Sequence, residues 1–175
     1  MFRSIRAKVQ PLKQGGLHLW WLVLLVLGLD QVTKIAVSSA LSLYEQVPVL
    51  PFFNIVLVHN EGAAFSFLAN AGGWQRWFFS IVAACVSLFI LVWLYGNARK
   101  YLWVNTALSL ILGGALGNLW DRVRLGYVVD FLDFYWQTMH FPAFNLADSA
   151  ISVGAFMLIV DMFRGDSQPQ EDRSK

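Results

Sequence analysis

Charged residues are scarce in this sequence. Asp, Glu, Lys and Arg make up 14% of its 175 residues, whereas 57% are hydrophobic and the mean hydropathy is +0.54. Soluble domains carry about a quarter charged residues, so this composition excludes an ordinary soluble enzyme or binding domain. The basic residues form no cluster with aromatic residues, and nucleic-acid binding therefore has no support.

Cysteine and histidine are also sparse. Cys85 is the only cysteine, which excludes an intramolecular disulfide and a metal cluster built from thiolates. The three histidines, His18, His59 and His140, form no HExxH motif, and no GxSxG motif supports a serine nucleophile. We therefore expect neither a metal nor a cofactor.

Long apolar runs fill most of the chain instead. A helix that crosses a membrane needs roughly 20 mostly apolar residues, and four such segments can be placed, at about 17–37, 77–95, 101–120 and 146–163. The connections between them are short, so we predict one membrane domain over residues 1–175, with polar termini at 1–16 and 165–175. The predicted fold class is an all-α polytopic membrane protein.

Basic residues are distributed unevenly around these four segments. Nine of the 13 lie before the first segment, between the second and third, or after the fourth. Positively charged loops stay in the cytoplasm, so we predict that both termini are cytoplasmic and that 38–76 and 121–145 face outward. A basic start before an apolar run is also typical of a cleaved signal peptide, but Asp30 and Lys34 place two charges near its end and disfavour that reading.

The first outward segment has local signals of its own. Val47–Val58 is rich in β-branched and aromatic residues and contains two prolines, which predicts short edge strands. His59–Gly62 has the composition of a turn. Ala63–Ala69 fits a short amphipathic helix on the membrane surface.

Most of the acids outside the C-terminal tail gather on the outward side. Ionisable groups at membrane depth are costly unless they are paired, so this gathering requires a reason. Two carboxylates held together can share one proton, with one acting as a general base on water and the other donating to a carbonyl oxygen. Asp130 and Asp148, on different predicted elements, are candidates for such a pair. Asp133 is an alternative acid in the same segment as Asp130.

A structural reading of the same acids stays open. An Asp in the first turn of a helix, such as Asp148, is typically a helix cap or a partner of the helix dipole. Three small residues, Gly113, Gly114 and Gly117, fit close approach either of helices or of a substrate. A small transporter would use the acids to bind a cation or relay protons, but it predicts acids at the bilayer midplane rather than at one face.

Five motifs, in their order along the chain, resemble the bacterial lipoprotein signal peptidases, also called type II signal peptidases. The residues that carry the resemblance are Asp30–Lys34, Asn60–Phe65, Gly113–Arg122, Val128–Phe131 and Phe144–Ser149. Each motif alone is weak, but all five in this order on four membrane segments are highly specific.

The resemblance implies an intramembrane aspartyl endopeptidase of the bacterial cytoplasmic (inner) membrane. Such an enzyme removes the signal peptide from diacylglyceryl-modified prolipoproteins on the N-terminal side of the lipidated cysteine. Its partners would be these precursors, membrane lipids and globomycin-type inhibitors. The fold it implies has four transmembrane helices, a small extracytoplasmic β-cradle and a short periplasmic amphipathic helix, with the active site near the outer face.

The resemblance also implies roles for individual residues. Matched by motif, Asp130 and Asp148 are the catalytic pair. The positions that line the substrate and inhibitor pocket are Asn60, Asn118, Arg122 and Asn145. Structural support is implied for Asp30, Lys34 and Asp121, with the two acids pairing with Lys34 and Arg122 or with helix backbone. The runner-up functions are a small membrane transporter and a structural membrane subunit that use the same acids as a polar network.

Overall fold

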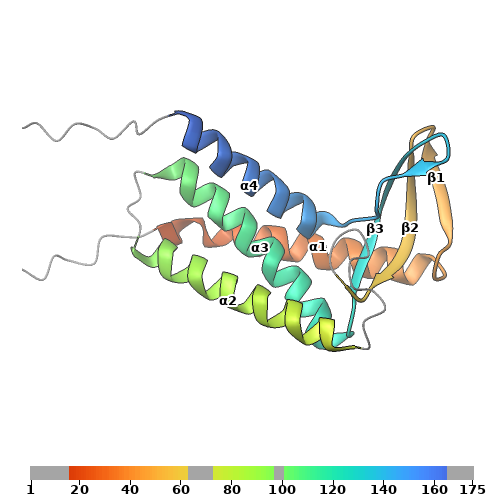
Figure 1. Ribbon diagram of the computed structural model, residues 1–175, viewed down its shortest axis with the longest axis horizontal. Coiled ribbons are helices and arrows are strands. Elements are labelled where there is room, and N and C mark those ends of the chain that lie inside the picture. Colours follow the sequence, from red (N-terminus) through yellow and green to blue (C-terminus); the bar gives the residue numbers. More distant parts are fainter. Residues whose placement is uncertain (1–15, 63–72, 97–100, 165–175) are drawn as a thin grey trace, which may run out of the picture.

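The computed structural model describes residues 16–62, 73–96 and 101–164. Within these ranges, four helices are long and apolar enough to cross a membrane, as predicted. They are α1 (Trp20–Ala40), α2 (Trp74–Gly96), α3 (Leu102–Arg124) and α4 (Leu146–Arg164), and a short 3₁₀ helix, η1 (Gly16–Leu19), precedes α1. Figure 1 shows them as a bundle with a small sheet at one end.

The helices extend beyond some of the predicted limits. Helix α1 continues to Ala40, α2 begins at Trp74, and α3 continues through Asp121 and Arg122 to Arg124. The predicted segments stop where polar residues begin, whereas helical hydrogen bonding continues as long as those side chains find partners. The polar termini and the amphipathic helix predicted at 63–69 lie outside the described residues.

Helix α3 is the centre of the bundle. In the 18-residue apolar stretch of α3, 56% is buried inside the protein, compared with 17–22% in the corresponding stretches of the other three helices. The core joins α1, α2 and α3 through Val23, Ile90 and Leu112. The outer helices carry large exposed apolar side chains, such as Ile81 and Phe156, which is the pattern expected where lipid rather than water surrounds the protein.

Three glycines of α3 lie at its contacts with α1 and α4. A Cβ added to Gly113 would lie 2.8 Å from Cβ of Val26, and one added to Gly114 would collide with the carbonyl oxygen of Ala147. A Cβ added to Gly117 would lie 2.6 Å from Oδ2 of Asp30. These glycines therefore allow close helix packing, one of the two uses left open by the sequence.

The sheet is antiparallel, with strand order β1-β2-β3-β4. Its strands are β1 (Gln46–Leu50), β2 (Phe53–Asn60), β3 (Val128–Trp136) and β4 (Met139–His140). Strand β1, which contains Pro48, is an edge strand as predicted, but β2 lies inside the sheet between β1 and β3.

The turn predicted at His59–Gly62 was wrong for its first two residues. His59 and Asn60 belong to β2 and pair with Val129 and Val128 of β3. The partner strand lies far away in the sequence, so the local composition could not reveal this pairing. The consequence for the site is that Asn60 is held in a fixed register beside β3.

The end of α3 that leads into the sheet is held against the start of α2. Gly126, with φ of 95°, lies in the tight turn that leads from α3 into β3. Arg76 of α2 donates hydrogen bonds from Nε and Nη2 to the carbonyl oxygens of Arg122 and Val123, at 2.8 and 3.0 Å. Two of the last carbonyls of α3 are thereby satisfied, and β3 follows directly after this end of α3 (Figure 1).

Candidate active site

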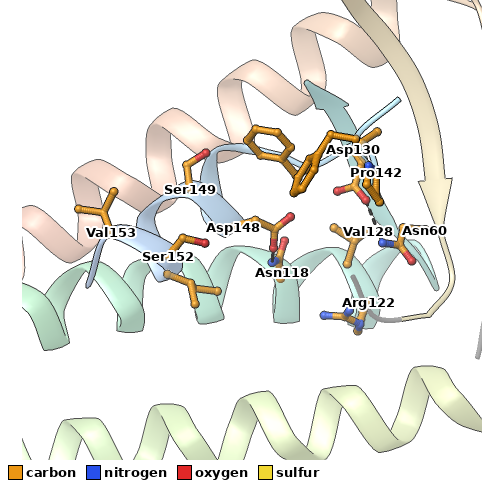
Figure 2. A pocket seen from close by; sticks show the side chains of 14 residues that line it. Asn60, Asn118, Arg122, Val128, Asp130, Pro142, Asp148, Ser149, Ser152 and Val153 are labelled. Atoms are coloured by element: carbon orange, nitrogen blue, oxygen red, sulfur yellow. Dashed lines mark hydrogen bonds between the residues drawn. The ribbon is translucent and has the colours of Figure 1, made fainter. Parts of the chain in front are cut away.

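A cavity of about 530 Å³ lies where α3 and α4 meet the sheet. Its polar lining comes from four elements, β2, α3, β3 and α4, and Figure 2 shows these side chains around one space. The polar residues are Asn60, Asn118, Arg122, Asp130, Asp148, Ser149 and Ser152. The apolar wall consists of Val128, Phe141, Pro142, Ala143, Phe144, Ile151 and Val153. Five of the six predicted catalytic and binding residues therefore line one cavity.

Asp130 lies on β3 and is almost fully buried. Its Oδ2 accepts a hydrogen bond from Nδ2 of Asn60 at 2.9 Å, and its Oδ1 accepts one from Nδ2 of Asn145 at 2.7 Å. Burial, and then the negative charge of Asp148, raise the pKa of Asp130 to about 7, although the two amide hydrogen bonds act in the opposite direction. This carboxyl group can therefore hold a proton near neutral pH.

Asp148 lies in the first turn of α4 and forms a reciprocal cap with Asn145. The Asn145 side-chain oxygen accepts the backbone N–H of Asp148 at 2.9 Å, and Oδ2 of Asp148 accepts the backbone N–H of Asn145 at 3.3 Å. This is the capping-box arrangement with Asp at the third helical position. The other oxygen, Oδ1, accepts Nδ2 of Asn118 at 2.8 Å. The capping role considered from the sequence is thus real, and the same carboxylate also faces the cavity.

Asn145 joins the two acids although it does not line the cavity itself. Its side-chain amide donates to Asp130 and its backbone N–H donates to Asp148. It also donates to the side-chain oxygen of Asn118 at 3.2 Å. A single fully buried residue therefore connects β3, α3 and the start of α4, and it sets the two acids beside each other. The pair Asp130 and Asp148 is called the dyad below.

Arg122 supplies the positive charge in the cavity lining. Its Nη2 donates to the carbonyl oxygen of Gly62 at 3.0 Å, and its guanidinium lies 5.5 Å from the ring centre of Phe79. Its Nε is buried without a hydrogen-bond partner among the described residues. Since Gly62 N–H donates to Asn60 Oδ1 at 3.0 Å, Arg122 supports the end of β2 that carries Asn60.

The three residues predicted to be structural form a buried cluster next to the cavity. Nζ of Lys34 lies 2.9 Å from Oδ2 of Asp30 and 2.8 Å from Oδ2 of Asp121. Of the partners expected for the two acids, Lys34 is the one that both take, and Asp30 also accepts a backbone N–H of α4. Arg122 is not the ion-pair partner of Asp121, because neighbouring helical residues point about 100° apart. Asp121 faces Lys34 and also accepts Nε2 of Gln31 at 2.9 Å, while Arg122 faces the cavity.

Asp133, the alternative acid, is excluded from the cavity by its place in the sheet. It is buried, and its carboxylate accepts Nδ2 of Asn54 at 3.0 Å and contacts Nδ1 of His140 at 2.9 Å. These contacts connect β3 with both neighbouring strands. Asp133 therefore serves the sheet rather than the cavity.

Some lining residues were not predicted from the sequence. Ile151 and Ser152 lie three and four residues after Asp148, a helical spacing that places them on the same face, so this signal was present. The loop 141–144 carries no comparable signal, because its position depends on the pairing of Phe144 with Leu132 of β3.

The part of the chain that the structure describes contains no cluster of side chains that could bind a metal ion. No three His, Cys, Asp or Glu side chains in residues 16–62, 73–96 and 101–164 are arranged to hold a metal ion. The polar groups that line the cavity are two carboxyl groups, the amides of Asn60 and Asn118, the hydroxyls of Ser149 and Ser152, and the guanidinium of Arg122.

Comparison with known proteins gives consistent matches over most of the chain. The family described as signal peptidase (SPase) II matches residues 22–164, a range that contains every residue lining the cavity. The lipoprotein signal peptidase of Alteromonas mediterranea is 53% identical over 161 residues, covering 91% of this chain and 88% of that protein. That of Shewanella piezotolerans is 55% identical over 151 residues, covering 86% of this chain and 89% of that protein.

A solved structure resembles the fold as well. It is a bacterial membrane enzyme determined by the in meso method at 2.3 Å resolution, with a TM-score of 0.79 and 31% sequence identity. The match covers 95% of this chain and 100% of that one. The similarity therefore includes the sheet and the bundle that together form the cavity.

Proposed function

Because this chain belongs to the signal peptidase II family, we propose that it removes lipoprotein signal peptides by aspartyl hydrolysis at Asp130 and Asp148. Family membership makes it a membrane protease that acts on lipoprotein signal peptides, and the resemblance of its five motifs is thereby confirmed. The observation that carries the dyad is that two acids from β3 and α4 line one cavity and are bridged by Asn145. A transporter or a purely structural subunit is not favoured.

The raised pKa of Asp130 assigns it the proton of the dyad, and the more accessible Asp148 acts as the base. Asp148 takes a proton from water as the water oxygen attacks the carbonyl carbon of the scissile peptide bond. Asp130 donates its proton to the carbonyl oxygen, which gives a gem-diol. Asp148 then protonates the amide nitrogen, the C–N bond breaks, and the diol returns a proton to Asp130 as the new carboxylic acid forms.

The remaining lining supports substrate placement. Amide groups of Asn60 and Asn118 and the guanidinium of Arg122 can hydrogen-bond the carbonyl oxygens of an extended peptide. The apolar wall, which includes Phe144 and Ile151, suits the apolar side chains and acyl groups of a lipid-modified precursor. We infer that the substrate is the diacylglyceryl-modified precursor, that cleavage falls just before its lipidated cysteine, and that globomycin-type inhibitors occupy the same space.

The position of the cavity fits a substrate that stays in the membrane. The sheet lies at one end of the bundle (Figure 1), and the dyad lies there on β3 and in the first turn of α4. Nine of the 13 basic residues come, in the sequence, next to the other ends of the helices. We propose that both termini face the cytoplasm of a bacterial cell and that cleavage occurs near the outer face of the inner membrane. Water then reaches the dyad from outside while the precursor remains anchored in lipid.

The test of the dyad is cleavage of a diacylglyceryl-modified precursor by purified variants. Asp130→Asn and Asp148→Asn should each lower turnover at least about a thousandfold, since each removes a proton-transfer group, while the protein remains folded. Asp133→Asn is the matched control, because this buried acid lies in the same strand but outside the cavity. Normal turnover by either dyad variant would contradict the assignment.

A further inference from the structure

Both dyad acids directly follow a residue whose backbone N–H is held by a buried carboxylate. Ala147 precedes Asp148, and its N–H donates to Oδ1 of Asp30 on α1 at 2.9 Å. This hydrogen bond crosses from the first helix to the start of the fourth. It fixes where the first turn of α4, and hence Asp148, sits relative to α1.

The same arrangement recurs at the other acid. Val129 precedes Asp130, and its N–H donates to Oδ2 of Asp121 on α3 at 3.2 Å. Asp121 is 2% exposed, so water does not compete for this bond. Strand β3 is therefore held against α3 one residue before the dyad acid.

Lys34 connects these two carboxylates to each other and to the cavity. Its Nζ lies 2.9 Å from Asp30, 2.8 Å from Asp121 and 3.1 Å from Oδ1 of Asn118. Asn118 in turn donates to Asp148. The ammonium group of Lys34, a residue that is 2% exposed, thus contacts three side chains, each of which is hydrogen-bonded to a dyad acid or to the residue just before one.

We propose that Lys34, acting through Asp30 and Asp121, is a positioning residue that sets both the spacing and the charge of the catalytic dyad. The proposal rests on the assignment of Asp130 and Asp148 made above. A residue needed only for helix packing would not have to contact both backbone anchors of the dyad. Gly117 contributes to the same arrangement, because a Cβ at this position would lie too close to Oδ2 of Asp30, which pairs with Lys34.

Lys34 also acts on Asp130 through its charge. The charged groups that act on Asp130 are Asp148 on α4, Arg122 on α3 and Lys34 on α1. Strand β2 presents the uncharged Asn60, while His59 stacks on Tyr127 instead. The ammonium of Lys34 favours the ionised form of Asp130, so its loss should raise the pKa of that carboxyl group. Loss of the negative charge of Asp30 leaves Lys34 less neutralised and should lower it.

The experiment compares Lys34→Met, Lys34→Arg and Asp30→Asn with the unmodified protein in a precursor-cleavage assay between about pH 5 and 9. Thr33→Val is the matched control, because Thr33 also lies on α1 but its hydroxyl donates to the carbonyl oxygens of Leu29 and Asp30 within that helix. We expect Lys34→Met to lower kcat roughly 100-fold, as a small misplacement of catalytic groups does, with little change in KM. The alkaline limb of its kcat/KM profile should move to higher pH.

The other variants separate charge from packing. Asp30→Asn keeps an oxygen for the N–H of Ala147, and its alkaline limb should move to lower pH, opposite to that of Lys34→Met. Lys34→Arg should restore the position of the limb, because it restores the charge. Thr33→Val should leave the profile unchanged. Folding of each variant is checked by gel filtration and thermal unfolding in detergent.

The outcomes are distinguishable. Unchanged kcat and pH profile in folded Lys34→Met overturns the positioning role. If Lys34→Met fails to fold, Asp30→Asn decides: a downward shift of its alkaline limb supports the proposal, and an unshifted limb overturns it. Full activity in Asp130→Asn would instead refute the dyad itself, independently of Lys34.

Discussion

Asn145 has two roles that substitutions can separate: it caps α4, and it donates a hydrogen bond to the dyad acid Asp130. Its side-chain oxygen caps α4 by accepting the N–H of Asp148, and its amide donates to Asp130, to Asn118 and to the carbonyl oxygen of Val129. Ser at this position keeps a capping oxygen but loses the amide donor. Ala loses both the cap and the donor.

The two losses have different magnitudes. Replacing a capping Asn by Ala costs about 1 kcal/mol of stability, and the loss of a hydrogen bond to a buried carboxylate costs about 1.5–3 kcal/mol. We therefore expect Asn145→Ala to be less stable than Asn145→Ser by about 1 kcal/mol. Both variants lose the donor that favours the ionised form of Asp130, so both should shift the alkaline limb of the kcat/KM profile to higher pH.

The assay combines thermal or denaturant unfolding in detergent with precursor cleavage over a pH series. Asn145→Asp is the informative third variant, because a carboxylate still caps the helix but adds a negative charge beside the dyad. It should be less stable than Asn145→Ser, because the new charge is fully buried beside two carboxyl groups, and it should show the lowest turnover of the three. Equal stability of the Ala and Ser variants would refute the capping argument, and an unshifted profile in both would refute the role of Asn145 as a donor to Asp130.

Two further predictions concern stability. Burial raises the pKa of Asp130 from 3.8 to about 7, so the stability that Asp130 contributes is complete below pH 3.8 and is lost as the pH rises through about 7. Asp130→Asn should therefore remove this part of the pH dependence of stability, as measured by unfolding at pH 5 and pH 8. An undiminished pH dependence in the variant would contradict the burial argument. Gly114→Ala should lower the free energy of unfolding by about 1–3 kcal/mol, because the new Cβ meets the carbonyl oxygen of Ala147. The control Gly28→Ala has nothing within 4 Å of its Cβ and should be neutral or slightly stabilising in the same unfolding assay. Equal effects of the two substitutions would refute the close packing of α3 on α4.

Local patterns were sufficient for the membrane helices and for one edge strand. The apolar runs predicted four helices because a membrane span depends on composition over roughly 20 residues and hardly on tertiary contacts. Pro48 correctly marked an edge strand, since its missing N–H is tolerated there. The turn predicted at His59 and Asn60 failed because their strand pairing depends on β3, a partner far away in the sequence.

Charge pairing shows the same division. Burying a charge is costly, so the sequence alone indicates that Asp30, Lys34 and Asp121 need partners. Which partner Asp121 takes depends on the direction in which each helical side chain points, and only the packing of α1 on α3 brings Lys34 to it.

By itself the sequence determined that this is a membrane protein with four spans, with its acids gathered toward one side and with motifs of one peptidase family. Those properties depend on composition and on order along the chain. Only the tertiary structure decided that Asp130 and Asp148 share a cavity, that Asp133 is excluded from it, and that Asn145 and Lys34 connect the acids to their supports. The physical reason is that hydrogen bonds and ion pairs require contact within about 3 Å, and contact between distant segments arises only when helices and strands pack.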